Sequence, residues 1–174
     1  VMLSQRGREA VEATKSSSFS ADLKKWTQIA EGYEKGQHAY HTTLPTDAIL
    51  VLRDTMNEAR GIGFAKVREG QMELGAKVRA LLESRGFASV AAVGYKSSVL
   101  VVSYTTNPDI QSGKAFLQVG LQTAAGVPLM VDEGTEFKTF RIGLFGLDKW
   151  QNVDRSVAHL AKALDSIGAS ASNN

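Results

Sequence analysis

The chain has 174 residues and carries 20 basic and 18 acidic side chains, so its balanced net charge of +2 does not indicate a nucleic-acid-binding protein. It contains no cysteine, which excludes disulfides, thiolate catalysis and zinc sites built on sulfur. No apolar run is long enough to span a bilayer and no secretory signal is visible, so we expect a cytoplasmic protein with no membrane partner.

The first part of the chain is predicted to be mostly polar and helical. Residues 1–4 are apolar enough for a short buried strand, and Ser4 can then cap a helix that runs to about Lys15. Residues 16–26 are polar and partly helical, and residues 31–43 contain the glycines and histidines typical of a loop.

Two helices are predicted to follow this loop. Pro45 fits the first turn of a helix that ends near Gly61 and has an apolar stripe formed by Ile49, Leu52 and Met56. A second helix is expected over residues 64–85, because Val67, Leu74, Val78 and Leu81 share one face.

From residue 97 onward the pattern alternates between strands and helices. Residues 97–104 form a β-branched run that predicts a strand, and residues 107–126 begin with an Asn-Pro helix start and predict a helix. Residues 128–132 and 138–144 are predicted to be antiparallel strands joined by a turn. A last helix begins after Asn152 with a regular apolar stripe: Val153, Val157, Leu160, Leu164 and Ile167.

These elements predict an α+β fold in which a small antiparallel sheet is covered on one face by helices. The pattern starts near residue 62, and residues 1–61 do not join it easily. We therefore expect two parts, residues 1–61 and residues 62–174.

Arg141 is the most unusual residue of the predicted strands, because it interrupts the apolar run "FRIGL" with a permanent charge. Its side chain opposes Phe140 and Ile142, so it should lie on the face that the helices leave uncovered. Two interpretations remain open from this pattern. Arg141 is either an exposed strand residue paired with a glutamate, or a guanidinium that binds a carboxylate through two parallel hydrogen bonds.

The segment "AYHTTLP" precedes the helix that begins after Pro45, and it offers hydroxyl groups close to a helix N-terminus. Such a position favours an anion, for example a phosphate, although Thr42 or Thr43 could equally be a simple helix cap. His38 and His41 are three residues apart, but no third metal ligand lies near them, and we expect no metal site.

Together, "YHTTLP" before an amphipathic helix and "FRIGLFG" before "NVDRSVAHLAKAL" resemble the class V aminotransferases of the fold-type-I pyridoxal-phosphate enzymes. The resemblance is greatest to the alanine–glyoxylate and serine–glyoxylate aminotransferase group, and it covers nearly the whole chain. It implies a homodimeric enzyme that acts on an amino acid and a 2-oxo acid such as glyoxylate or pyruvate.

The resemblance also implies roles for three residues. Arg141 matches the arginine that binds the substrate carboxylate in this family. Tyr40 and Thr43 match the two hydroxyl-bearing residues that reach across the dimer interface to the cofactor phosphate of the other subunit. No role follows for His41 or Thr42.

The family's cofactor lysine has no counterpart here, because none of the lysines of the chain occupies that motif. The resemblance thus implies the C-terminal portion of an aminotransferase, with residues 1–61 as the tail of the large cofactor-binding domain and residues 62–174 as the small domain. Without the Schiff-base lysine, this chain alone is expected to be inactive and not to retain pyridoxal phosphate.

A different class of function is compatible with the same residues. The chain could be a stand-alone, non-catalytic α+β domain that binds a small anion or mediates dimerisation. A cysteine desulfurase or lyase is disfavoured by the absence of cysteine. If the chain is the C-terminal portion of an aminotransferase, the apolar stripe of Ile49, Leu52 and Met56 has lost its large-domain neighbours and predicts self-association.

Overall fold

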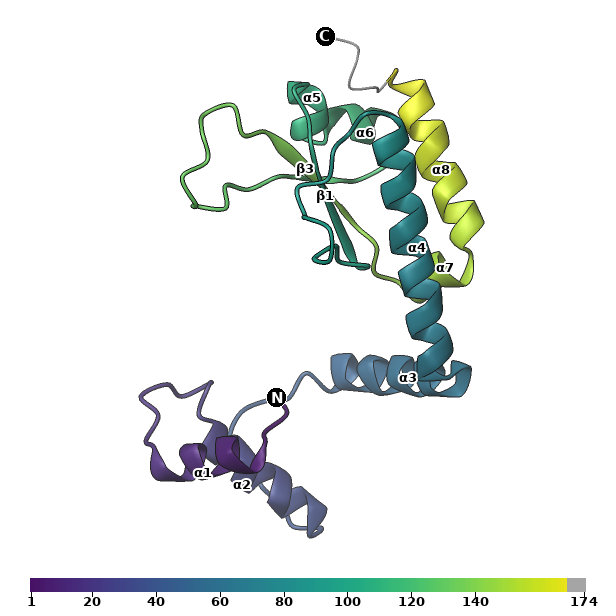
Figure 1. Cartoon of the computed structure of the whole chain (residues 1–174). Helices are drawn as coiled ribbons and strands as arrows, with labels where there is room; N and C mark the ends of the chain where they lie inside the picture. The colour runs from purple at the N-terminus through teal and green to yellow at the C-terminus, as the bar shows by residue number, and fades with distance from the viewer. Residues whose placement is uncertain (169–174) are drawn as a thin grey trace. The chain divides into compact units, whose positions relative to one another are not determined.

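The computed structural model describes residues 1–168 and divides the chain into two compact units, Val1–Asp54 and Thr55–Asn174 (Figure 1). The last six residues, 169–174, lie outside the described part, as does most of the tail that follows the last helix. The boundary between the units falls inside helix α3 (Thr46–Ile62). Whether residues 1–61 and 62–174 belong to two domains of a longer protein stays a prediction.

The N-terminal unit contains α1 (Gln5–Ala13), α2 (Leu23–Glu34) and the first half of α3. The Ser4 side chain accepts a hydrogen bond from the Gly7 amide, which confirms the predicted helix cap. The predicted buried strand over residues 1–4 is wrong, since Val1 and Met2 are 98% and 99% exposed. Residues 1–54 contain no strand with which such a segment could pair its backbone groups.

Helix α2 extends further than the sequence predicted and includes the beginning of the expected glycine-rich loop. Gly32 lies inside this helix, and a Cβ atom there would come within 3.1 Å of the Ala39 Cβ. The glycine therefore permits a close approach of the returning chain and does not mark a loop.

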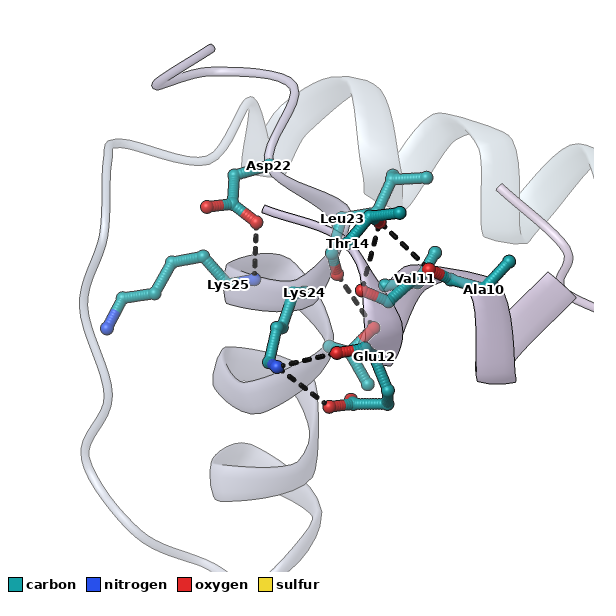
Figure 2. A network of polar contacts seen from close by, with 9 residues as sticks. Ala10, Val11, Glu12, Thr14, Asp22, Leu23, Lys24 and Lys25 are labelled. Atoms are coloured by element: carbon teal, nitrogen blue, oxygen red, sulfur yellow. Dashed lines mark hydrogen bonds and ion pairs between the residues drawn. The ribbon is translucent and has the colours of Figure 1, made fainter. Parts of the chain in front are cut away.

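Polar contacts hold α1 and α2 together. Apolar packing contributes little, since Ile29 is the only buried hydrophobic side chain of residues 1–54. Figure 2 shows Lys24 between the backbone carbonyl of Glu12, at 3.0 Å, and the Glu12 carboxylate, at 3.2 Å. Nearby, Asp22 caps α2 by accepting a hydrogen bond from the Lys25 amide. A unit with so small a core depends on its hydrogen bonds and ion pairs for its shape.

The C-terminal unit is built on a three-stranded antiparallel sheet with the order β1-β3-β2. Figure 1 labels β1 and β3. Strand β1 is Leu100–Tyr104, β2 is Ala124–Ala125, and the central strand β3 is Thr139–Gly143. The predicted strand over residues 128–132 is therefore wrong, because the neighbour of β3 lies earlier in the chain.

Within residues 55–168, five helices lie entirely in this unit, and the second half of α3 also belongs to it. The predicted helix over residues 107–126 is two short helices, α5 (Pro108–Gln111) and α6 (Lys114–Gln118), separated by Gly113, whose φ of +78° breaks the helix. The other elements are the second half of α3, α4 (Phe64–Ser84), α7 (Leu147–Gln151) and α8 (Val153–Ser166). Of these, α7 was not predicted, whereas α4 and α8 begin and end close to their predicted bounds.

Helices α4 and α8 run side by side and cover one face of the sheet (Figure 1). Phe140 of β3 is fully buried there, with its ring 5.4 Å from that of Phe87 and 5.7 Å from that of Phe116. Around these rings lie side chains from the helices and from β1, among them Leu74, Val78, Val101 and Leu164. The predicted α+β class, with a small antiparallel sheet covered on one face, is confirmed.

One stripe of α4 binds the segment that leads into β1. Gln71 donates a hydrogen bond to the Ser98 carbonyl at 2.8 Å, and Arg79 donates to the Ser97 carbonyl at 2.5 Å. Gly75 lies between them, directly against the Ser98 backbone. Arg79 is only 6% exposed, and this burial lowers the pKa of its guanidinium from the ordinary value.

None of the helices within residues 1–168 combines the length and the apolar content that crossing a bilayer requires.

Candidate functional site

Arg141 lies at the centre of the sheet, on the strand that is paired on both sides. Its backbone is opposite Val102 of β1 and Ala124 of β2. Because side chains alternate along a strand, Arg141 points away from the core that its neighbour Phe140 enters. The sequence predicted this orientation.

The Arg141 side chain contacts the backbone of the adjacent strand. Its Nε atom donates a hydrogen bond to the Ala125 carbonyl at 2.8 Å. Within residues 1–168, no carboxylate lies within ion-pair distance of the guanidinium, and its two terminal nitrogens donate to no protein acceptor. The interpretation of Arg141 as half of a surface ion pair thus finds no partner in the described part, and its role in substrate binding stays a prediction.

Strand β2 can approach β3 this closely because the next residue is glycine. The Gly126 amide donates to the Thr139 carbonyl at 2.8 Å. A Cβ atom at Gly126 would lie 1.6 Å from the Thr139 Oγ1 atom and 2.5 Å from its carbonyl oxygen. Only a residue without a side chain fits between these atoms.

The connection from β2 to β3 folds around Glu133. The Glu133 carboxylate accepts hydrogen bonds from the amides of Leu129, Met130 and Val131, the last two at 2.9 and 2.7 Å. These bonds lower the pKa of the Glu133 carboxyl below its ordinary value. They also explain why no strand forms at residues 128–132, since amides that bind a carboxylate cannot pair with β3.

A cavity of about 440 Å³ lies where β3 ends, between Ile142–Leu144 and helix α8. Its rim carries Asp148 and Arg155, which form an ion pair at 2.5 Å that lowers the pKa of the Asp148 carboxyl. Arg141 does not line this cavity. This cavity is therefore separate from the predicted carboxylate-binding residue.

Tyr40 and Thr43 belong to the N-terminal unit, between α2 and α3. Tyr40 is 67% exposed and Thr43 is also exposed, and neither hydroxyl group has a hydrogen-bond partner among residues 1–168. Asp47 lies in the first turn of α3. Its negative charge opposes an anion at the helix N-terminus, so an anion here would depend on hydroxyl donors such as those of Tyr40 and Thr43.

His41 has a structural role in the same segment. Its Nε2 atom lies 2.9 Å from the Phe19 carbonyl, and its ring lies tilted against Phe19 and edge-on to Trp26, with ring centroids 4.3 and 5.2 Å apart. These contacts fix the backbone between Tyr40 and Thr43. In the described part of the chain, no three histidine, cysteine or acidic residues are grouped so that they could hold a metal ion.

Sequence reasoning did not identify the groups around Arg141. The Ala125 carbonyl and Gly126 are part of an ordinary "AAG" run, which contains no signal for a strand of two residues. The glycine was a possible sign of close backbone approach, but the sequence suggested only that it ended a helix.

The chain matches no family model. It is 28% identical over 168 residues to 2-aminoethylphosphonate–pyruvate transaminase 1 of Burkholderia lata, a match that covers 92% of this chain and 43% of the relative. It is 29% identical over 168 residues to the 2-aminoethylphosphonate–pyruvate transaminase of Burkholderia ambifaria, with 92% and 42% covered.

Two solved structures have a similar fold. The alanine–glyoxylate aminotransferase of Nostoc sp. superposes with a TM-score of 0.71 at 22% identity, over 95% of this chain and 42% of that one. The ureidoglycine–glyoxylate aminotransferase of Bacillus subtilis gives 0.68 at 18% identity, over 98% and 43%. The homologues are thus aminotransferases, as the two motifs suggested, and this chain spans less than half of their length.

Proposed function

Because the relatives of this chain are aminotransferases, we propose that it is the C-terminal part of a class V, pyridoxal-phosphate-dependent aminotransferase. The whole enzyme would transfer an amino group between a small amino acid and a 2-oxo acid such as glyoxylate or pyruvate. The names of all four relatives include one of these two oxo acids.

The observation that carries this proposal is the unpaired terminal fork of Arg141 on a rigid central strand. Both oxo acids present a carboxylate next to the carbonyl that receives the amino group. A guanidinium binds a carboxylate through two parallel hydrogen bonds, which fixes both the position and the orientation of the small acid. Arg141 would thereby align the neighbouring carbonyl for reaction.

Tyr40 and Thr43 would bind the phosphate of pyridoxal phosphate in the partner subunit of a homodimer. Their exposed, unpartnered hydroxyl groups suit an anion that comes from outside the unit. When bound, this cofactor supplies the electron sink for chemistry at the substrate Cα atom. The contribution of this chain is to bind and orient, because the lysine that holds the cofactor is expected in the other half of the enzyme.

The amino donor has two candidates. An α-amino acid such as alanine would place its carboxylate on Arg141, as the oxo acid does. The two sequence relatives are named for 2-aminoethylphosphonate, which carries a phosphonate in place of a carboxylate. The arginine fork can bind phosphonate oxygens in the same bidentate manner, so the same residue could serve both half-reactions.

Self-association would follow from the exposed apolar face of α3. Leu52 and Met56 are 59% and 61% exposed, and Ile49 and Leu50 are each 46% exposed. In a homodimer, a second copy of the chain that covers this face would remove these apolar side chains from water. Dimerisation would also bring Tyr40 and Thr43 to the partner's cofactor.

Two experiments test the proposal. The purified 174-residue chain, supplied with pyridoxal phosphate, alanine or 2-aminoethylphosphonate, and glyoxylate or pyruvate, should show no turnover. In the complete gene product, Arg141→Lys should lower kcat/KM for the oxo acid by at least about 30-fold, because the second hydrogen bond of the fork is lost.

Arg155→Lys is the matched control, since Arg155 already pairs with Asp148 of the same chain. It should leave kcat/KM within about twofold, the effect of an exposed ion pair. Transamination by the 174-residue chain alone, or equal effects of the two arginine substitutions, would contradict the proposal.

A further inference from the structure

We infer that the Ala125 carbonyl sets how Arg141 binds its ligand, and that Gly126 is the positioning residue that keeps this carbonyl in place. Arg141 would bind a carboxylate end-on, through its two terminal nitrogens. The anchoring of Arg141 by Ala125 and Gly126 depends only on the geometry of this chain, whereas the identity of the ligand rests on the proposed function.

A guanidinium has two edges that can form a bidentate pair. One edge uses the two terminal nitrogens, and the other uses Nε and one terminal nitrogen. In Arg141 the Nε hydrogen is already donated to the Ala125 carbonyl at 2.8 Å. The side edge is therefore occupied by the protein, and the terminal edge remains for a ligand.

The position of this carbonyl depends on how closely β2 lies against β3. Ala124 is opposite Arg141 and Ala125 is opposite Phe140, and the Gly126 amide closes the pairing on the Thr139 carbonyl at 2.8 Å. The strand has only two residues, so one further hydrogen bond is a large part of its attachment.

Gly126 makes this approach possible. A Cβ atom would meet the Thr139 Oγ1 atom at 1.6 Å, and it would also meet the Thr139 carbonyl oxygen and carbon at 2.5 and 2.7 Å. Thr139 is buried, and its backbone belongs to the central strand, so it cannot move aside. A side chain at position 126 must therefore move β2, and with it the acceptor that holds Arg141.

The test measures exchange of the arginine Hε protons with solvent, by NMR of the ¹⁵N-labelled 174-residue chain. The Arg141 resonance is assigned by its loss in Arg141→Lys. Arg68, an exposed arginine with no hydrogen-bond partner among residues 1–168, serves as the internal reference. We expect the Arg141 Hε proton to exchange about tenfold more slowly than that of Arg68.

Gly126→Ala should remove this protection, while the backbone spectrum shows that the C-terminal unit stays folded. Gly134→Ala is the matched control, because it lies in the same connection and its Cβ atom would meet nothing within 4 Å. Thr139→Ala combined with Gly126→Ala should not restore protection, since the backbone of residue 139 still blocks the Cβ atom.

Titration with sodium acetate, against sodium chloride at equal concentration, then tests the binding mode. We expect acetate to bind the wild-type chain without accelerating Hε exchange, and to bind Gly126→Ala about three- to tenfold more weakly. If Gly126 only stabilised the fold, Gly126→Ala would change neither the Hε exchange rate of Arg141 nor the affinity for acetate well below the unfolding temperature.

The outcomes separate the two proposals. Unprotected Hε in the wild type, or equal protection in Gly126→Ala, overturns the inference, and so does acetate that speeds Hε exchange by displacing the carbonyl. Even if Gly126→Ala fails to fold, the Hε exchange rate of the wild-type chain shows whether the Ala125 carbonyl holds Arg141. Protected Hε without any acetate binding would leave the anchor in place and count against the proposed carboxylate role of Arg141.

Discussion

Replacing Gly75 by alanine should destabilise the C-terminal unit, although alanine is the better helix former. Gly75 is buried in α4, and an added Cβ atom would lie 2.7 Å from the Ser98 Cα atom and 2.8 Å from its carbonyl oxygen. Both are backbone atoms, so no side-chain rotation can relieve the clash. The segment that carries Ser98 would have to move off α4.

The size of the effect follows from two opposing terms. Overpacking of this kind costs about 1–3 kcal/mol, and the helix propensity of alanine returns about 0.5–1 kcal/mol. Moving this segment also weakens two hydrogen bonds, from Gln71 to the Ser98 carbonyl and from Arg79 to the Ser97 carbonyl. Each of them contributes about 1 kcal/mol. We expect a net loss of about 2 kcal/mol in the free energy of unfolding.

Urea unfolding followed by tryptophan fluorescence measures this loss. A Trp26→Phe background leaves Trp150, which is buried in the C-terminal unit, as the single reporter. Gly61→Ala is the control: it lies in helix α3, its Cβ atom would meet nothing within 4 Å, and it should be neutral or stabilising by up to about 1 kcal/mol. If Gly75→Ala is as stable as the wild type, the close contact with Ser98 is not part of the native packing.

Three further predictions concern separate parts of the chain. Leu52→Ser with Met56→Ser should shift the sedimenting species toward monomer, because the exposed apolar face of α3 then loses two of its large apolar side chains. Glu133→Gln should move the Met130 amide resonance, and the wild type should approach the same position as acid protonates the carboxylate, at a pH below the ordinary pKa of a glutamate side chain. The sign follows because the native pKa of Glu133 is lowered, so the bonds are present at neutral pH and are lost once acid protonates the carboxylate. Arg79→Met should lower the free energy of unfolding by about 2 kcal/mol in the urea assay, since the Ser89 hydroxyl and the Ser97 carbonyl lose the part-buried hydrogen bonds that Arg79 donates.

The long helices and the central strand could be predicted because local pattern and tertiary environment agree there. The apolar stripes of α4 and α8 are the faces that enter the core, as Leu74, Val78, Leu160 and Leu164 show. The alternation around Phe140 likewise predicted which way Arg141 points. The spacing of apolar residues indicates which side chains are buried, and burial of apolar side chains is the main interaction that stabilises these elements.

The errors occur where a single hydrogen bond or contact outweighs propensity. Residues 128–132 have the composition of a strand, but the amides of Met130 and Val131 donate to the Glu133 carboxylate and are not available for strand pairing. Residues 1–3 are apolar, but no strand in their unit can pair with them. Gly113 divides a regular helical pattern by adopting a positive φ. None of these interactions has a periodic signal in the sequence.

Arg141 and Tyr40 belong to different units of the chain, and different contacts hold each of them in place. Arg141 lies on a strand paired on both sides, above the fully buried Phe140, with Nε fixed on a backbone carbonyl. Tyr40 lies in a connecting segment whose order comes from the contacts of His41, and its own side chain is exposed. A residue that binds substrate within its own unit benefits from such preorganisation. Under the proposed function, Tyr40 and Thr43 would gain their final orientation only when the partner subunit is present, so they would need only to be accessible in the isolated chain.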